Sequence, residues 1–376
     1  MDISVIVPLY YGNKYVYNIR EMIKKNEVKL KENGKNVDVE LIFINDSPDE
    51  KIIINEDERI QLYNNEFNMG VQRSRIEGLK HSTGKYVLFL DQDDTIAENY
   101  LLSQLECIGE ADAVVCNGYY RRDKLIYDTT RNVEIKKNVF CYTRHVIISP
   151  GQVLIKRESI PQEWCIDILQ HPGTDDYLLW VLMCANNATF LVNMKPLYTH
   201  VENGSNTFLH WKDMGDSLKE VISYVEGAGK LSRHELDQLI SSAKISINKL
   251  NDYARLEEKW KIANRWNIVL TNYFNNKNIY EIAIYGYGVI GEMVVRELQE
   301  EGVEIKYLID QDSALYRNPE YKIYNSAEVL PYVDLVIVTP LFAFEEIRLK
   351  LKAQNLGYVI SLEEILDDLL GKVKKF

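Results

Sequence analysis

An acidic cluster, Asp91-Gln92-Asp93-Asp94, directly follows the strongly apolar stretch from Tyr86 to Leu90. Three carboxylates within four residues repel one another unless a cation or hydrogen bonds compensate their charge. A hard divalent ion such as Mg²⁺ or Mn²⁺ prefers oxygen ligands, and it commonly binds one or two carboxylates together with substrate phosphates. The cluster therefore indicates a metal–diphosphate site. The alternative is an acidic turn that caps the next helix, because Asp is common at helix N-termini.

A second candidate site lies in the C-terminal part, where Gly286, Gly288 and Gly291 form the pattern G-x-G-x-x-G. The strand-like run 281–285 precedes the pattern, and Asp310 follows Gly291 by 19 residues. Between a strand and a helix, such glycines let the backbone approach a pyrophosphate, and the later acid binds a ribose. The spacing predicts nucleotide binding. A scaffold or oligomerisation role is the alternative.

The N-terminal candidates follow segments whose composition predicts an alternation of strands and helices. Such an alternation indicates an α/β fold with a mostly parallel sheet, whose ligands bind at the carboxyl ends of the strands. Tyr10, Asp46 and Asp91 each follow one predicted strand, so we expect them at one edge of the sheet. Strands are predicted at 3–10, 39–44, 61–63 and 85–90, and helices at about 13–30 and 71–80.

The rest of the chain divides into two further parts. From Trp211 to Asn275 apolar residues recur at spacings of three and four, which is typical of helices. A polar stretch follows, and a new strand begins at Ile282. We therefore expect an α/β domain over residues 1–210, a helical linker or subdomain over 211–278, and a small α/β domain over 279–376.

Length and charge limit the function classes. At 376 residues the chain is long enough for two domains, and 46% hydrophobic residues supply material for their cores. Lysine and arginine number 44 against 56 acidic residues, a net charge of −12. This balance argues against a nucleic-acid partner, because such binding depends on basic residues that neutralise phosphates. A small polyanion remains compatible, because a metal ion can supply positive charge locally.

The distribution of apolar residues and cysteines favours a cytoplasmic protein. The apolar run that begins at Ile3 has neither the basic segment nor the cleavage site of a signal peptide. No apolar run reaches the ~20 residues that a membrane-spanning helix needs. Five cysteines without a C-x-x-C pair indicate neither a disulfide framework nor a zinc site. Peripheral association with the inner face of a membrane is left open.

Four segments in the N-terminal half occur in a characteristic order. They are residues 4–10, 43–47, 68–75 and 88–94, which read SVIVPLY, FINDS, NMGVQRSR and LFLDQDD. Together they resemble family 2 glycosyltransferases of the GT-A fold, and the resemblance covers roughly residues 1–210. The C-terminal part resembles the Rossmann-like modules attached to many bacterial glycan-assembly proteins.

The resemblance implies roles for residues of the nucleotide-sugar site. Pro8 and Tyr10 would flank the base, and Asp46 would accept a hydrogen bond from uracil or ribose. Arg75 matches a family arginine near the diphosphate, where a planar guanidinium can chelate phosphate oxygens. Arg73 is its competitor, and an exposed charge on a helix is the alternative for either residue. The expected nucleotide-sugar-binding residues are Pro8, Tyr10, Asp46, Asn68, Arg75, Asp91 and Asp93.

The same resemblance implies a divalent ion, Mn²⁺ or Mg²⁺, bound through the Asp-x-Asp motif. Asp93 is the expected ligand and Asp91 would face the ribose, whereas Asp94 is either a second ligand or a helix cap. His200 lies in a polar, Gly-containing segment where family members place a mobile loop, and it is a further candidate metal ligand. A structural role for this histidine is the alternative.

A second acidic pair, Asp175-Asp176, precedes an apolar segment that carries Trp180. It resembles the Glu-Asp motif of the family and places Asp176 at the position of the catalytic base, with Asp175 in reserve. A base is needed because a sugar hydroxyl is a poor nucleophile until its proton is removed. Two adjacent carboxylates raise the pKa of one of them, which suits this role. A pair of helix-capping residues is the alternative.

One departure from the family pattern concerns the segment after the second strand. The usual Asp-Asp-Gly-Ser reads Asn45-Asp46-Ser47-Pro48 here, so the first acid and the glycine are absent. This difference affects the expected geometry of the loop and the expected preference for the nucleobase of the donor.

The residues and the resemblance together predict a metal-dependent glycosyltransferase with a UDP-linked donor, and the resemblance implies that transfer inverts the configuration of the sugar. The acceptor would be a glycan, lipid-linked or protein-linked, in bacterial surface polysaccharide or glycoprotein assembly. The alternatives are a nicotinamide-dependent oxidoreductase and a non-catalytic nucleotide-sugar-binding protein, both acting through the C-terminal glycines. A second nucleotide in the C-terminal domain and assembly into a homo-oligomer are compatible with the sequence.

Overall fold

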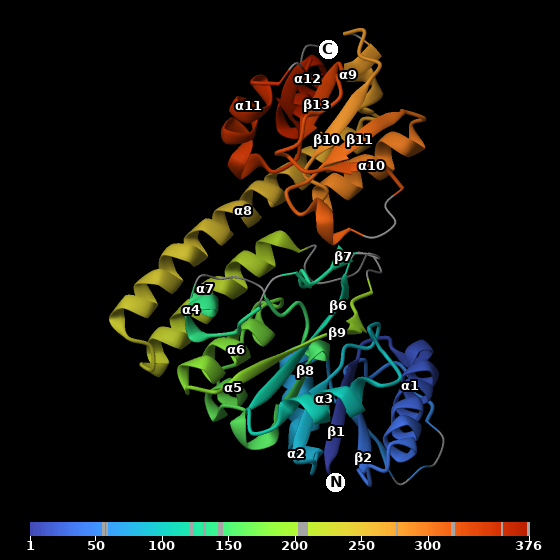
Figure 1. Ribbon diagram of the computed structural model, residues 1–376, viewed down its shortest axis with the longest axis vertical. Coiled ribbons are helices and arrows are strands. Elements are labelled where there is room, and N and C mark those ends of the chain that lie inside the picture. Colours follow the sequence, from blue (N-terminus) through green and yellow to red (C-terminus); the bar gives the residue numbers. More distant parts are fainter. Residues whose placement is uncertain are drawn as a thin grey trace. The chain divides into compact units, whose positions relative to one another are not determined.

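The computed structural model describes residues 1–54, 57, 59–120, 124–130, 133–141, 146–201, 210–275, 277–316, 320–354 and 356–373 (Figure 1). The chain forms two compact units, Met1–Ser246 and Ile247–Phe376. Helix α8, Arg233–Arg265, crosses the boundary between them. The helical segment expected at 211–278 therefore belongs in part to each unit, and the predicted three-part division remains a prediction. Among the described residues, no helix has the length and apolarity needed to cross a bilayer.

The first unit is built on a mixed sheet with the strand order β3-β2-β1-β4-β8-β6-β9-β5, and β7 pairs with β6. The four strands β3, β2, β1 and β4 are parallel neighbours, which confirms the alternation predicted for the N-terminal part. Antiparallel pairing begins where β8 joins β4. The strands are β1 Ile3–Leu9, β2 Val39–Asn45, β3 Ile60–Asn64, β4 Tyr86–Phe89, β5 Thr95–Ile96, β6 Ala113–Tyr120, β7 Lys124–Leu125, β8 Val153–Lys156 and β9 Phe190–Thr199.

Helices pack on this sheet because their apolar residues follow the helical period. In α1, the buried residues Val16, Ile19, Ile23 and Leu30 lie on one face. In α6, every residue from Tyr177 to Ala185 is buried, so this helix lies inside the unit. The helices are α1 Asn13–Glu32, α2 Val71–His81, α3 Tyr100–Ile108, α4 Lys137–Cys141, α5 Gln162–Ile166, α6 Asp175–Ala185 and α7 Trp211–Ala228, and Pro150–Gln152 and Arg157–Ser159 form short 3₁₀ turns.

The second unit contains a five-stranded sheet with the order β12-β11-β10-β13-β14. All four strand pairs are parallel, so crossover connections must link the strands. This unit therefore has an α/β fold, as the sequence predicted for residues 279–376. Its elements after α8 are α9 Thr271–Asn275, β10 Ile282–Tyr285, α10 Val289–Glu300, β11 Ile305–Ile309, β12 Ile323–Tyr324, β13 Leu335–Val338, α11 Phe344–Lys352, β14 Tyr358–Ser361 and α12 Leu362–Val373.

Glu40 is a buried carboxylate near the start of β2, and its side chain ties three segments together. It is 2% exposed. One oxygen accepts hydrogen bonds from Ser4 Oγ at 2.6 Å, Thr83 N at 2.6 Å and Gly84 N at 3.2 Å. Burial acts to raise its pKa, but these hydrogen bonds outweigh burial and lower it.

We expect Glu40→Gln to lower the free energy of unfolding by about 1–3 kcal/mol, because an amide places donors against donors in a buried site. Since the folded pKa is lowered, the wild-type advantage should be complete above the unfolded pKa of about 4.3 and should vanish as pH falls through the folded value. Urea denaturation as a function of pH measures both. Asp38→Asn, at an exposed acid two residues earlier, is the control; equal losses in the two variants would contradict the assignment.

Candidate active site

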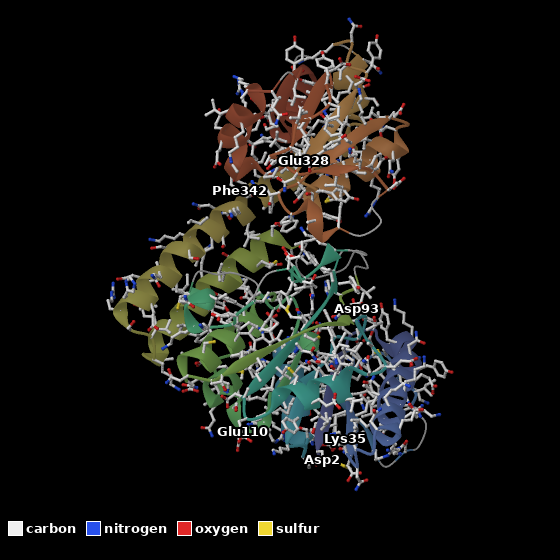
Figure 2. All side chains as sticks on the ribbon, viewed as in Figure 1. Asp2, Lys35, Asp93, Glu110, Glu328 and Phe342 are labelled. Carbon is white, nitrogen blue, oxygen red and sulfur yellow. The ribbon has the colours of Figure 1, made fainter. Side chains whose placement is uncertain are left out.

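The parallel strands β2, β1 and β4 end at the same edge of the sheet, and this places the loops that follow them side by side. Asp46 N donates to Leu9 O at 2.8 Å, and Tyr11 N donates to Ser47 Oγ at 2.8 Å. Figure 2 shows Asp93, from the third of these loops, at the opposite end of the first unit from Asp2. The structure thus brings together the three loops that the sequence predicted to share an edge.

Gln92, the middle residue of the Asp-x-Asp motif, connects two of these loops. Its Oε1 accepts from Tyr10 N at 2.9 Å, and its Nε2 donates to Tyr10 O at 3.1 Å. A Cβ at Gly12 would lie 2.4 Å from Gln92 Oε1, so the glycine leaves room for this amide. Sequence reasoning missed Gln92, because nothing in its spacing reveals a partner in the first loop.

Asp46 is 4% exposed, and both of its oxygens accept hydrogen bonds from the protein. Oδ1 accepts from Asn65 Nδ2 and Met69 N, each at 2.7 Å, and Oδ2 accepts from Gly70 N at 2.8 Å. These bonds hold the segment that leads into α2, where Gly70 has a φ of 84°. The geometry gives Asp46 a structural task at the site. Its predicted contact with uracil or ribose stays a prediction.

The other nucleotide candidates of these loops differ in exposure. Pro8 lies within β1 and is half-buried, whereas Tyr10 is 52% exposed at the end of that strand. Asn68 is exposed, and its Oδ1 accepts from Gly70 N at 3.0 Å. Tyr10 therefore offers an accessible ring at the strand edge, which is compatible with contact to a base.

Arg75 occupies the centre of the acidic site. Helix α2 places it inside the unit at 4% exposure, whereas its competitor Arg73 is exposed. Its Nη1 donates to Asp175 Oδ2 at 2.6 Å, and its Nη2 donates to Asp91 Oδ1 at 2.5 Å. One guanidinium therefore joins the loop after β4 to the first turn of α6.

Asp175 and Asp176 begin α6 and have different surroundings. Asp175 is 5% exposed and is paired with Arg75, and its backbone oxygen accepts from the indole of Trp164 at 2.8 Å. Asp176 is partly exposed, and its Oδ1 accepts from Tyr177 N at 2.7 Å. Burial and the charge of Asp175, opposed by Arg75, raise the pKa of Asp176 to about 7. Asp176 thus has the protonation range that a general base needs near neutral pH.

Asp94 is 2% exposed and lies in a network at the end of β9. Its Oδ2 accepts from the hydroxyl groups of Tyr198 and Ser149, and its Oδ1 accepts from Val201 N at 2.9 Å. His200 Nδ1 lies 3.1 Å from the same Oδ1. The structure therefore brings Asp94 and His200 together, but the carboxylate already has several protein partners. The remainder of the polar segment, 202–209, lies outside the described residues.

Asp93 is a partly exposed carboxylate that lies between two other acids in the sequence of this cluster. Burial and the charges of Asp94 and Asp91 raise its pKa to about 6. Such repulsion is what a bound cation would relieve. Within the described parts of the chain, no group of three or more His, Cys, Asp or Glu side chains is already arranged to hold a metal ion.

The C-terminal glycines form a close turn between β10 and α10. Gly286 has a φ of +90°, and a Cβ at Gly291 would lie 1.9 Å from Gly286 O, so both positions require glycine. Gly288 immediately precedes α10. Asp310 Oδ2 accepts from Tyr287 N at 2.9 Å. The structure thus brings the four predicted residues together and uses the acid to hold the turn.

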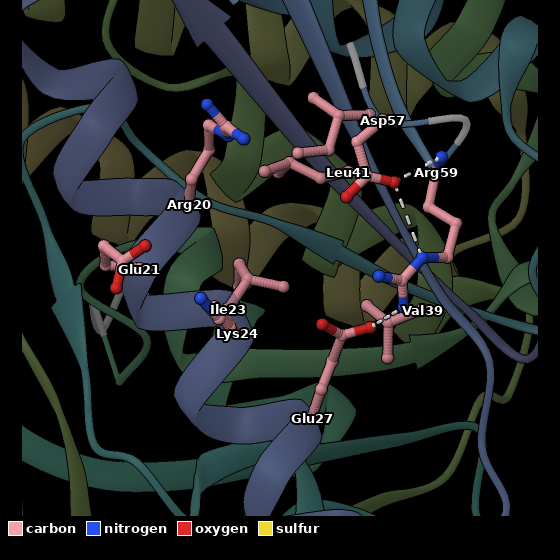
Figure 3. A pocket seen from close by; sticks show the side chains of 10 residues that line it. Arg20, Glu21, Ile23, Lys24, Glu27, Val39, Leu41, Asp57 and Arg59 are labelled. Carbon is pink, nitrogen blue, oxygen red and sulfur yellow. Dashed lines mark hydrogen bonds and ion pairs between the residues drawn. The ribbon is translucent and has the colours of Figure 1, made fainter. Parts of the chain in front are cut away.

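Two cavities lie away from these residues. One, of about 180 Å³, lies between α1 and the edge formed by β2 and β3. Within it, Arg59 pairs with Glu27 at 2.5 Å and with Asp57 at 3.6 Å (Figure 3). The other, of about 340 Å³, is in the second unit and is lined by Tyr273, Lys277, Ile279 and Tyr358. Neither cavity is lined by residues of the acidic site, which we identify from the contacts of its side chains.

We expect Asp46→Asn to loosen the segment before α2, because an amide nitrogen would replace one of two buried acceptors, at a cost of about 1–3 kcal/mol. Amide hydrogen exchange at Met69 and Gly70 should accelerate about 5- to 100-fold. Asp49→Asn, at an exposed acid of the same loop, is the control and should leave these amides unchanged. Unaltered protection in Asp46→Asn would contradict the assigned structural task.

Comparison with known proteins agrees with the arrangement of these loops. The Glycosyl transferase family 2 model matches residues 4–162. An uncharacterized glycosyltransferase of Rickettsia conorii is 23% identical over 80% of this chain and 49% of its own length. The minor teichoic acid biosynthesis protein GgaB of Bacillus subtilis is 36% identical over 42% of this chain and 18% of its own length. The chain therefore spans less than half of either relative.

Among solved structures, residues 1–349 of TarS from S. aureus align at a TM-score of 0.47 and 17% identity, over 65% of this chain and 71% of that chain. This similarity is too low to support a functional argument. The family match coincides with the loops that form the acidic site, Tyr10, Asp46 and Asp91 to Asp94. The N-terminal part of the chain is therefore similar to family 2 glycosyltransferases.

Proposed function

We propose that this protein transfers a sugar from a nucleoside-diphosphate sugar, UDP-linked, to an acceptor hydroxyl with inversion of configuration. One observation carries the proposal: Arg75 joins Asp91, in the Asp-x-Asp loop, to the acidic turn that contains Asp176. The donor-binding loop and the candidate base are thereby held in one cluster at the carboxyl edge of the sheet. This edge is where α/β folds bind their ligands.

In this reaction Asp176 takes the proton of the acceptor hydroxyl while the hydroxyl oxygen forms a bond to C1 of the sugar. The bond between C1 and the diphosphate oxygen breaks, and its electron pair leaves with the nucleotide. Asp176 suits this role because it is partly exposed and its pKa is raised to about 7. Holding base and donor in line lowers the entropic part of the barrier.

The residues fit a divalent ion, Mn²⁺ or Mg²⁺, because three carboxylates, those of Asp91, Asp93 and Asp94, lie close together in the loop after β4 and carboxylate oxygens are the ligands that such ions prefer. Asp93 would hold it, with Asp94 and His200 as the further predicted ligands. Such an ion offsets negative charge on a departing diphosphate. Tyr10 and Pro8 would contact the base, Asp91 would face the ribose, and Asp46 and Asn68 would shape the nucleotide pocket.

The acceptor is proposed to be a glycan, lipid-linked or protein-linked, in bacterial surface polymer assembly. The printed role of the Bacillus relative in minor teichoic acid biosynthesis supports such a setting. An activated nucleotide sugar is a cytoplasmic metabolite in this scheme, so we place the reaction in the cytoplasm, at the inner face of the membrane.

A second nucleotide site is proposed at the C-terminal glycine turn, within a Rossmann-like module. The observation that favours it is the parallel order of the sheet, with Gly286 at the carboxyl end of β10 next to Thr339 after β13. In doubly wound sheets this is the position at which nucleotides bind.

A panel of nucleotide sugars tests the donor site, with nucleotide release and thermal shift as readouts in the presence of Mn²⁺. Asp93→Ala should abolish the Mn²⁺-dependent shift, because it removes the expected ligand. Glu98→Ala, at an exposed acid of the next segment, is the control and should keep it. A shift of equal size in Asp93→Ala would contradict the assignment of the metal ligand.

Asp176→Asn should bind donor normally but lose at least about 100-fold in transfer, since general bases typically contribute 10²–10⁴-fold. Because only the ionised form accepts a proton, kcat/KM of the wild type should rise with pH through about 7 and then level off. Near-normal transfer by Asp176→Asn would show that another residue is the base.

For the C-terminal site, we expect UDP-sugars, NAD⁺ or NADH, added without a divalent ion, to raise the melting temperature of the full chain in a manner that Gly288→Val weakens and Asp93→Ala does not. A side chain at this position would obstruct approach of a pyrophosphate to the start of α10. Equal shifts in the two variants for every nucleotide would contradict a second site.

A further inference from the structure

We propose that Arg75 is a positioning residue that couples the candidate base to the donor-binding loop, and that it does not bind the diphosphate. This inference rests on the proposed function of the same site. It departs from the resemblance, which implied that this arginine contacts phosphate oxygens.

The first argument is the direction of the guanidinium. An arginine that chelates a phosphate presents its donor fork to the ligand. Here the two terminal nitrogens face two different carboxylates, Asp175 at 2.6 Å and Asp91 at 2.5 Å. Arg75 is 4% exposed, so little of the fork is left for a ligand. A diphosphate could reach it only by displacing one of these carboxylates.

The second argument concerns what the pairing holds in place. Asp91 and Asp175 are 84 residues apart in the sequence, and Arg75 lies on a third element, α2. The start of α6 is held further by the bond from Trp164 Nε1 to Asp175 O and by the contact of 2.6 Å between the hydroxyl groups of Thr174 and Ser217. Asp176 is the next residue of this fixed turn, so its position follows from that of Asp175.

The third argument is electrostatic. The charged groups that face Asp176 are Asp175, Arg75 and Asp91. Burial and the two carboxylates raise the pKa of Asp176, and Arg75 opposes them. The ion pair that positions the base therefore also affects its proton affinity: Asp175 raises the pKa of Asp176, and Arg75 lowers it.

Because the two residues act in opposite directions, replacing each one should shift the pH profile of the 376-residue chain in opposite directions. Arg75→Met should move the acid limb of the pH profile of donor hydrolysis to higher pH, because it removes the positive charge that lowers the pKa of Asp176. Asp175→Asn should move it to lower pH, because it removes the nearest negative charge. We expect each displacement to be about one pH unit, a tenfold change in proton affinity. Lys80→Met, at an exposed cation of the same helix, should leave the profile unchanged.

The affinity for UDP with Mn²⁺, measured by calorimetry, separates positioning from phosphate binding. We expect Arg75→Lys and Asp175→Asn to retain the wild-type Kd within about threefold while kcat falls at least about tenfold, consistent with misplacement of a catalytic group. A Kd raised more than about tenfold in Arg75→Lys, with an unmoved acid limb, would overturn the inference and make Arg75 a phosphate ligand.

Two further measurements keep the test decisive. If Arg75→Met fails to fold, the double variant Arg75→Met/Asp175→Asn replaces it, because removing both members of the pair leaves less buried charge without a partner. The acid limb of its pH profile should lie between those of the single variants Asp175→Asn and Arg75→Lys. Carboxyl-carbon NMR titration of Asp176, assigned with Asp176→Asn, reads the same displacements without any substrate. If the wild type neither binds UDP nor releases it from any nucleotide sugar, the proposed function fails, and this titration still tests the coupling; identical Asp176 titration in wild type and Asp175→Asn would refute it.

Discussion

The buried ion-pair cluster around Arg75 is the interaction on which the candidate site depends. Two carboxylates share one guanidinium: Asp175, whose side chain is buried, and Asp91, whose side chain is partly exposed. Burying a charge is costly unless it is paired and hydrogen-bonded, so the buried guanidinium of Arg75 and its two carboxylate partners stabilise one another in this position. The charges that stabilise the site are therefore the same charges that shift the pKa of Asp176. Burial of a large part of α6 supplies the apolar surroundings that make those charges interact strongly.

The sheet determines which residues can meet at this cluster. Since β2, β1 and β4 run in parallel, loops from three distant parts of the chain emerge at one edge. The acidic residues there have two different uses. Asp46 and Asp94 are buried and bonded to the protein, whereas Asp93 and Asp176 are partly exposed and have raised pKa values. The buried acids hold the loops, and the partly exposed acids are those to which the proposed function assigns the metal ion and the acceptor proton.

The strands and the edge at which the candidate residues gather were predictable from the sequence, because runs such as 3–9 and 39–45 combine β-branched residues with turn signals at their ends. The partnership of Arg75 with Asp175 was not, because the two residues are 100 positions apart and each type has many alternative partners. The hydrogen bonds of Asp46 could not be assigned from the sequence either, since an acid after a strand is compatible both with ligand binding and with accepting hydrogen bonds from backbone N–H groups. Pair-level detail of this kind depends on tertiary packing, which a single sequence does not specify.

The bonds between Gln92 and the backbone of Tyr10 have an evolutionary consequence. A Cβ at Gly12 would lie 2.4 Å from Gln92 Oε1 and 2.9 Å from Leu9 Cδ2, so a side chain there would displace the amide that bonds to Tyr10 and press on the end of β1. A lineage that keeps the contact between the first loop and the Asp-x-Asp motif should therefore keep glycine at position 12.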